Sequence, residues 1–286
     1  MNAHAPYSVA VSDKVFTRTR GRPRGRPTNK PATNVKALER ALILLQTVAE
    51  ADSMSLTDLS QRAGMPASTA HRLLMTLQSF GYLEFDEESQ LWTIGVEAFR
   101  IGGSFTRRIK VVEAGRPMLR ALMEKTGETA NMAIADDGDV VFVSQVETHE
   151  PIRAFHRPGT RAHMHASGIG KALLAHMDAS GLDNWMAKKG LPTYTDNTIA
   201  DPEALRNEMA AVRERGWAID NEERTLGMRC VAAPVYNEYG EAIAGISVSG
   251  PSVRIPDSAL TEYGLLVRQS ADDITRSIGG APPAHR

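Results

Sequence analysis

The sequence SLTDLSQRAGMPASTAHRLLMTLQSFGY, residues 55–82, decides the fold of the N-terminal part of the chain. It predicts two short helices joined by a tight turn. Ser55 followed three residues later by Asp58 is typical of a capped helix start. Gly64 suits the end of that helix and Pro66 the first turn of the next, because glycine tolerates a left-handed backbone and proline needs no amide partner there.

The second of these helices has two different faces. Its apolar residues recur at helical spacing and predict a buried stripe: Ala70, Leu73, Leu74 and Leu77. The opposite face carries hydrogen-bonding side chains and no acid: Ser68, Thr69, His71, Arg72 and Thr76. A helix anchored on one face and rich in donors on the other is typical of recognition in the major groove of DNA. An ordinary helical hairpin with a solvated polar face is the alternative.

The neighbouring segments favour DNA binding. Residues 35–51 predict a helix whose apolar face includes Leu38 and Leu42. Residues 82–94 then change to a period of two on either side of a polar turn, which predicts a β-hairpin in the place of a wing. Together these elements predict a winged helix-turn-helix domain over residues 34–94.

A basic arm precedes this domain. Residues 1–33 are polar and contain almost no large apolar side chains, which predicts disorder. The motif Arg-Gly-Arg-Pro occurs twice in succession and resembles the core of the AT-hook; its arginines are Arg20, Arg22, Arg24 and Arg26. Proline keeps such a segment extended, and arginine favours the narrow minor groove of A·T-rich DNA. A solubilising basic tail is the alternative.

Composition and charge limit the function classes. The chain has 286 residues, enough for two domains. Residues 1–50 carry nine Lys/Arg against three acids, whereas residues 95–286 carry 22 against 25, so a polyanion partner is expected at the N-terminal end. Cys230 is the single cysteine, which excludes intramolecular disulfides and fits a reducing cytoplasm. With neither a signal peptide nor an apolar run of membrane-spanning length, we expect a cytoplasmic protein with no membrane partner.

The rest of the chain predicts an α+β sensor domain. Residues 95–110 predict a linker helix and residues 111–281 a separate domain. Within it we expect, in order, a helix at 108–125 interrupted near Pro117, a hairpin at 129–146, a strand at 152–156, helices from 168, at 183–189 and at 202–215, strands at 230–236 and 242–249, and a closing helix at 256–278. Strands and helices mixed around an antiparallel hairpin favour this class over a doubly wound sheet.

Several long motifs resemble the IclR family of bacterial transcriptional regulators. They are STAHRLLMTLQSFGYL (68–83), LWTIGVEAFRIGGSF (91–105), GETANMAI (127–134), MHASGIGKALLA (164–175) and DNEERTLGMRCVAAPVYNEYGEAIAGISVSGP (220–251). The likeness is greatest to the repressors of the glyoxylate shunt and of allantoin use. The resemblance implies a winged helix-turn-helix, a linker helix that dimerises, a GAF-like effector-binding domain, and dimers that pair into tetramers on operator DNA. It implies no cofactor.

The resemblance also implies an effector site. In regulators of this type that bind glyoxylate or pyruvate, the polar set corresponds to Gly168, Ile169, Asp220, Cys230, Ser247 and Ser249. The first two open a helix, whose amide groups and positive end suit a carboxylate. Ala154 and Ala162 stand where such relatives carry bulky aliphatic residues, so a larger pocket is expected. Without the resemblance, each of these residues alone has an ordinary structural reading.

Other functions have less support. Gly168-Ile169-Gly170-Lys171 lacks the remaining residues of a P-loop, and the sequence around Ser167 is not a nucleophile elbow. His163 and His165 could form a metal pair, although a polar pair lining a pocket is the more ordinary reading. The sequence therefore predicts a DNA-binding repressor, with no catalytic or metal site, whose operator binding is modulated by a small carboxylate. A ligand-dependent activator of aromatic- or organic-acid catabolism is the alternative.

Overall fold

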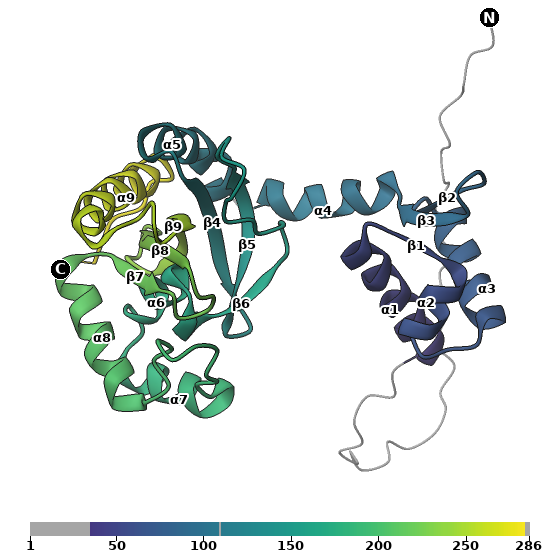
Figure 1. Ribbon diagram of the computed structural model, residues 1–286, viewed down its shortest axis with the longest axis horizontal. Helices are drawn as coiled ribbons and strands as arrows, with labels where there is room; N and C mark the ends of the chain where they lie inside the picture. The colour runs from purple at the N-terminus through teal and green to yellow at the C-terminus, as the bar shows by residue number, and fades with distance from the viewer. Residues whose placement is uncertain (1–34, 109, 284–286) are drawn as a thin grey trace, which may run out of the picture. The chain divides into compact units, whose positions relative to one another are not determined.

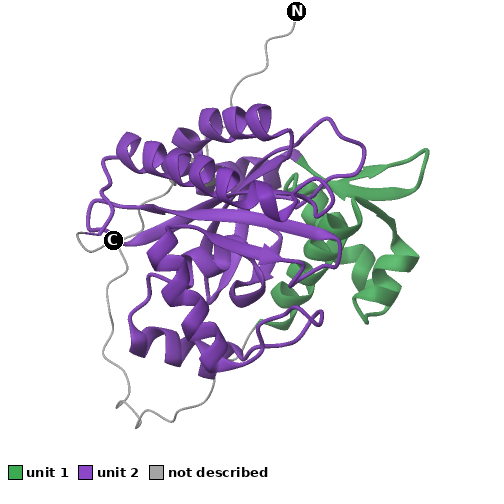
Figure 2. Cartoon of the chain, turned by 60° about the vertical axis from the view of Figure 1, so that its left-hand side comes forward, with its two compact units in different colours: residues 1–95 green, residues 96–286 purple. Residues whose placement is uncertain are grey.

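The computed structural model describes residues 35–108 and 110–283. The chain divides into two compact units, residues 1–95 and 96–286, which Figure 2 distinguishes by colour. The predicted basic arm, including Arg20, Arg22, Arg24 and Arg26, lies outside the described residues. Among the described residues, no helix is both long enough and apolar enough to cross a membrane.

The first unit is a winged helix-turn-helix. Its elements are α1 (Lys36–Ala51), β1 (Ser53–Ser55), α2 (Leu56–Arg62), α3 (Ala67–Ser79), β2 (Leu83–Asp86) and β3 (Leu91–Ile94) (Figure 1). The strands form an antiparallel sheet in the order β1-β3-β2. Ser55 caps α2 by accepting from the amide of Asp58 at 3.2 Å, and Gly64 has a φ of 61°, as the sequence predicted.

One stripe of each helix forms the core of this unit. Leu44 and Val48 of α1 pack with Ala70 and Leu74 of α3 and with Trp92 of the sheet. The predicted apolar face of α1 was therefore partly wrong: Leu38 is 58% exposed and Leu42 is 49% exposed. A three-helix domain covers only the stripe that faces α3 and the sheet, and these two leucines lie one turn apart outside it.

The second unit is an α+β domain. Its elements are α4 (Val96–Arg108), α5 (Lys110–Thr126), β4 (Thr129–Asp136), β5 (Asp139–Val146), β6 (Arg161–His163), the 3-10 turn η1 (Met164–Ala166), α6 (Gly168–Leu174), α7 (Ala179–Lys189), α8 (Pro202–Arg215), β7 (Ala218–Asn221), β8 (Met228–Tyr236), β9 (Ala242–Pro251) and α9 (Asp257–Ser277). The six strands form one antiparallel sheet in the order β6-β5-β4-β9-β8-β7.

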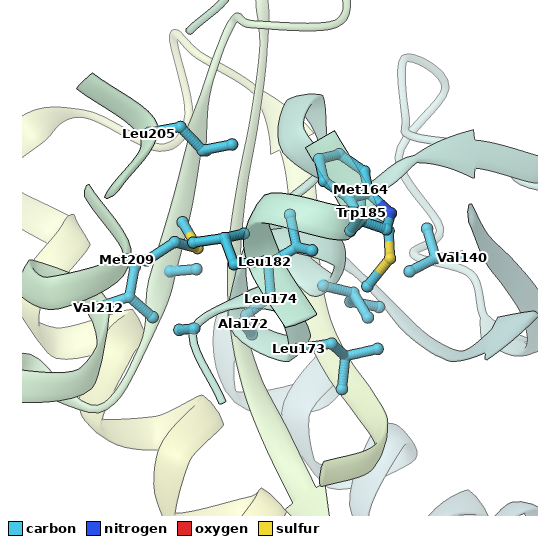
Figure 3. Close-up of a cluster of buried hydrophobic side chains, with 14 of the residues drawn as sticks. Val140, Met164, Ala172, Leu173, Leu174, Leu182, Trp185, Leu205, Met209 and Val212 are labelled. Carbon is cyan, nitrogen blue, oxygen red and sulfur yellow. The ribbon is translucent and has the colours of Figure 1, made fainter. Parts of the chain in front are cut away.

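Helices cover both faces of this sheet. In Figure 1, α5 and α9 lie together on one face, where they enclose a core with β4, β8 and β9. The other face is covered by α6, against which α7 and α8 pack; Figure 3 shows the apolar side chains of this second core. Because Ile246 and Val248 of β9 belong to the α5–α9 core, the alternate residues Ser247 and Ser249 face α6.

Two local predictions in this unit were wrong. Pro117 lies inside α5 without interrupting it; it is exposed, and buried Leu119 and Leu122 hold the helix against the sheet despite the lost amide bond. The expected strand at 152–156 is irregular, and β6 begins only at Arg161. The edge of β5 pairs with residues 160–163, so residues 152–156 have no strand to pair with.

Candidate functional site

A polar surface forms along α3 in the first unit. Ser68, His71, Arg72 and Thr76 are exposed, and Thr69 is half-buried. The helix has no acid in its first turn and no side-chain cap, so its first amides remain available to an anion. Thr76 donates its hydroxyl to the carbonyl of Arg72 at 2.9 Å, which leaves it only an acceptor role toward a partner.

The first turns of α1 extend this surface. A groove between α1 and α3 is lined by Lys36, Ala37, Arg40, Thr69, Arg72, Leu73 and Thr76. Lys36 and Arg40 were not among the residues predicted to contact DNA, although their spacing of four places them on one helix face. Both are exposed, and with Arg72 they bring three positive charges to one groove.

The wing has the opposite charge. The segment from Leu83 to Ile94 contains four acids and no base: Glu84, Asp86, Glu87 and Glu88. Asp86 accepts from the amide of Ser89 at 2.7 Å and from its hydroxyl at 3.0 Å, and these bonds lower the pKa of the carboxyl. An acidic turn repels phosphate, so the charge distribution favours an anion at α3 and the start of α1 over one at the wing.

The second unit contains a cavity of about 260 Å³ between α6 and the sheet. Its lining includes all eight residues that the sequence predicted for the effector site: Ala154, Ala162, Gly168, Ile169, Asp220, Cys230, Ser247 and Ser249. They come from five elements and one loop, and adjacent strands place Asp220 opposite Cys230 and Cys230 opposite Ser249. The structure thus brings together residues that are up to 95 positions apart in the sequence, counting from 154 to 249.

Hydrogen-bond donors concentrate at the α6 end of this cavity. Ser167 caps α6 by accepting from the amide of Gly170 at 3.4 Å, whereas the amides of Gly168 and Ile169 lie in the first turn, where no helical acceptor exists. A Cβ on Gly168 would lie 2.7 Å from Cys230 Sγ, so glycine allows the helix start to approach β8 closely. Ser247 and Ser249 are 1% and 5% exposed.

Asp220 is the acidic group of the cavity. Burial, followed by the neighbouring Glu223 carboxylate, raises the pKa of Asp220 to about 7. Its Oδ1 accepts from the amide of Glu223 at 2.9 Å. Burial also raises the pKa of the Cys230 thiol to about 11, so Cys230 stays a neutral thiol at physiological pH.

A buried ion pair lies behind Asp220. Lys171 of α6 pairs with Glu223, and Glu208 lies 3.9 Å from the same ammonium group. The side chains of Lys171 and Glu223 are 1% and 6% exposed. Burial raises the pKa of Glu223 while Lys171 opposes that rise, which is the pattern of a paired buried acid. The pair fixes α6 to the segment that follows β7.

The aromatic and cationic residues at the rim of the cavity were not predicted from the sequence. The rings of Phe142 and His156 stack with centroids 4.1 Å apart, and Arg224 lies over Tyr194 at 4.0 Å from the ring centroid. Both Phe142 and Arg224 line the cavity. No local motif marks these residues, because only the sheet and the loop after β7 bring them to the same place.

The histidine pair does not form a metal site. The rings of His163 and His165 are 6.1 Å apart, and His165 Nε2 lies 2.9 Å from the carbonyl oxygen of Pro192. Within residues 35–108 and 110–283, no group of three or more His, Cys, Asp or Glu side chains is arranged to hold a metal ion.

Two family models match the two units. Residues 37–87 match the IclR helix-turn-helix domain, and residues 103–276 match the C-terminal domain of the bacterial transcriptional regulator IclR. The chain belongs to the IclR family. This confirms the family that the sequence motifs indicated and the α+β class with an N-terminal winged helix-turn-helix.

Individual IclR relatives match over most of the chain. The HTH-type transcriptional regulator BhcR of Paracoccus denitrificans is 49% identical over 93% of this chain and 95% of its own length. The transcriptional repressor IclR of Escherichia coli is 40% identical over 91% and 96%. The repressor AllR of Klebsiella pneumoniae is 36% identical over 93% and 98%. The two repressors to which the motifs indicated the greatest likeness, IclR and AllR, are therefore among the relatives, and BhcR has a higher identity than either.

Solved structures agree with this assignment. The crystal structure of Thermotoga maritima IclR is 26% identical, covers 86% of this chain and 100% of that chain, and superposes with a TM-score of 0.75. Because the relatives are named as transcriptional regulators and repressors, this IclR-family chain is a DNA-binding transcription regulator and not an enzyme.

Proposed function

We propose that this chain is a repressor whose operator affinity is modulated by a small organic carboxylate bound in the cavity beside α6. The observation that carries the proposal is the convergence on one cavity of Ser247, Ser249 and Cys230 with the first amides of α6. These neutral donors, in a cavity whose lining also includes Arg153, Arg224 and Arg229, favour a ligand with acceptor oxygens. A carboxylate offers two oxygens with several lone pairs.

The size of the cavity limits the ligand. A water molecule occupies about 30 Å³ in the liquid, so 260 Å³ corresponds to roughly nine non-hydrogen atoms at that density. Glyoxylate and pyruvate, with five and six such atoms, fit with room to spare. The small side chains of Ala154 and Ala162 contribute to this space, which also allows a longer or aromatic acid.

On the DNA side, we propose that α3 enters the major groove through Ser68, Thr69, His71, Arg72 and Thr76. Lys36 and Arg40 of α1 contact the adjacent phosphates, and the arginines of the basic arm contact a minor groove. Phosphate contacts fix the register and base contacts supply specificity. Operators of helix-turn-helix proteins consist of paired half-sites, and each chain supplies one α3. Two chains must therefore bind together as a dimer.

We further propose that α4 mediates dimerisation and that dimers pair into tetramers. Several of its large apolar side chains are exposed: Val96 at 70%, Phe99 at 77% and Ile101 at 42%. Val96 and Phe99 are three positions apart and share one helix face, and exposed apolar groups on one face are typical of a helix that packs against a second copy. Sedimentation or light scattering tests this assembly, and a monomer at micromolar concentration would contradict it.

Two sets of variants test the two halves of the proposal. Arg72→Ala should weaken binding to the protein's own promoter region by about 1–3 kcal/mol if Arg72 reads a base. Gln78→Ala, a change on the same helix at a half-buried residue outside the groove, is the control. Unchanged binding of the Arg72 variant in fluorescence anisotropy would remove this residue from the contact surface.

The effector site is tested separately. Ser247→Ala combined with Ser249→Ala should abolish the response of promoter binding to pyruvate or glyoxylate while leaving binding itself intact. Ser252→Ala, just beyond β9, is the matched control. An unaltered response in the double variant would mean that the effector binds elsewhere.

A further inference from the structure

The cavity serines are connected to two side-chain amides, of which Asn131 is buried and Gln145 is half-buried. Gln145 donates from Nε2 to Asn131 Oδ1 at 2.8 Å, and Asn131 donates from Nδ2 to Ser249 Oγ at 3.2 Å. Ser249 Oγ lies 3.5 Å from Ser247 Oγ. Neither Asn131 nor Gln145 lines the cavity, so both act at a distance from any ligand.

Sheet register places these side chains in one row. Asn131 of β4 lies opposite Gln145 of β5 on one side and opposite Ser247 of β9 on the other. Residues directly opposite each other in a sheet share a face, so the row runs across three strands on the α6 side. Asn131 is completely buried, and its two side-chain bonds satisfy both ends of its amide.

The direction of these bonds has a chemical consequence. An amide side chain accepts at its oxygen and donates at its nitrogen. Because Gln145 occupies the oxygen of Asn131, the nitrogen must face Ser249. Ser249 then accepts from Asn131, so its own proton points away from Asn131, toward Cys230 and Ser247 at the cavity wall. Each link donates toward the ligand, and the amide dipole presents its positive end in the same direction.

We propose that Asn131 and Gln145 are positioning residues that fix the polarity of Ser249, so that the cavity selects ligands with acceptor oxygens. This inference rests on the proposed binding of a carboxylate in the same cavity. With the amide of Asn131 reversed, Ser249 would donate to Asn131 and offer only lone pairs to the ligand. The cavity would then favour a ligand with N–H donors.

Pyruvate and pyruvamide are the matched probes, because they have nearly the same shape and differ at one end, where pyruvate carries a charged acceptor and pyruvamide a neutral amide with N–H donors. In Asn131→Leu, which keeps a similar volume, Ser249 loses its fixed donor and regains a free lone pair. We expect pyruvate to bind about tenfold more weakly and pyruvamide to bind no more weakly than to the unaltered protein. The measurement is isothermal titration of the full-length protein.

Gln145→Glu is the stronger test, because a carboxylate at this half-buried edge position accepts from Asn131 and turns its oxygen toward Ser249. We expect pyruvate to bind at least about tenfold more weakly and pyruvamide about threefold more tightly. Added negative charge alone would weaken pyruvate and leave the neutral pyruvamide unchanged. Gln145→Met, which removes the bond without reversing it, is the control. An unchanged preference between the two probes in Gln145→Glu would overturn the proposal.

A ligand-free measurement separates this inference from the proposed function. In the unliganded protein, Ser249→Ala should shift the side-chain amide resonances of Asn131, because its Nδ2 loses an acceptor. Absence of that shift would show that the chain of bonds does not exist, whatever the protein binds. If the unaltered protein binds no carboxylate but the shift is present, the bonds are real, and both the proposed effector class and the ligand preference inferred from it are wrong.

Discussion

Carboxylate binding should depend on pH through Asp220. Its pKa of about 7 means that the group is about 90% protonated at pH 6 and about 10% protonated at pH 8. An ionised Asp220 at roughly 4 Å from a ligand carboxylate would cost about 4 kcal/mol at an effective dielectric constant of about 20. Because of that cost, protein with an ionised Asp220 hardly binds the ligand. The apparent affinity for a carboxylate therefore follows the fraction of Asp220 that is protonated, and it should fall about tenfold from pH 6 to pH 8.

Proton uptake provides a direct assay. Because the bound acid holds Asp220 in its neutral form, binding at pH 8 should take up close to one proton. Calorimetry in two buffers of different ionisation enthalpy measures this number. His156, which also lines the cavity, does not produce this proton uptake at pH 8. Burial lowers its pKa, so the imidazole is already neutral there.

Asp220→Asn isolates the cause. The variant should bind pyruvate with the same affinity at pH 6 and pH 8 and without proton uptake, whereas the exposed change Asp196→Asn should leave the pH dependence intact.

The stability contributed by Asp220 should also fall as the pH rises. A raised pKa in the folded protein stabilises at acid pH, and this contribution is lost as the pH rises from about 4 through about 7. Asp220→Asn should therefore raise the melting temperature more at pH 8 than at pH 5. Affinity that is flat with pH in the unaltered protein would refute the reasoning.

Three further outcomes are expected. Replacing Glu87 and Glu88 of the wing by lysine should tighten binding to any duplex and steepen its salt dependence, by up to one phosphate contact per lysine; anisotropy at several salt concentrations measures both. Lys171→Met should lower the free energy of unfolding, measured by urea titration, by about 3–5 kcal/mol, because it leaves Glu223 buried without its partner. Adding Glu223→Gln to this variant should recover part of the loss. Gly170→Ala should prevent stable folding, since its Cβ would lie 2.2 Å from a carbonyl oxygen of the preceding 3-10 turn, and retention of a normal melting temperature would contradict the geometry.

The first unit was largely predictable because its signals are local. Ser55, Gly64 and the stripe that contains Ala70 and Leu74 each follow from spacing along a single helix. The three-residue strand β1 was not predicted, because so short a segment shows no alternation and becomes a strand only through pairing with β3. The exposed side of α1 was also missed, since the stripe that a helix buries depends on its neighbours.

The second unit was predictable where turns and caps mark its elements. The hairpin of β4 and β5 and the helix α8, which ends at left-handed Gly216, have the predicted positions with ends that differ by at most one residue. The strand β6 was placed too early and β7 was not predicted at all. Both are edge strands of four residues or fewer, and both are defined by one neighbour in the sheet rather than by their own sequence.

The cavity beside α6 was also predictable only in part. Eight of its lining residues were predicted through family motifs, not through any physical signal in the chain, because a serine pair or a lone cysteine has no distinctive spacing. The groups that decide its chemistry were not identified. The pKa of Asp220, the pair of Lys171 with Glu223, and the amide chain behind Ser249 depend on contacts between elements far apart in the sequence.

The placement of these polar groups argues that they serve binding rather than stability. On the α5–α9 side of the sheet, β9 contributes only apolar side chains such as Ile246 and Val248 to a packed core. On the α6 side the same strand buries Ser247 and Ser249 beside Asp220, and burial of polar groups is costly unless each is bonded. Apolar residues of similar size would pack there at lower cost. Several buried polar groups at one end of one sheet face, lining a cavity, support the proposed binding of an acceptor ligand there.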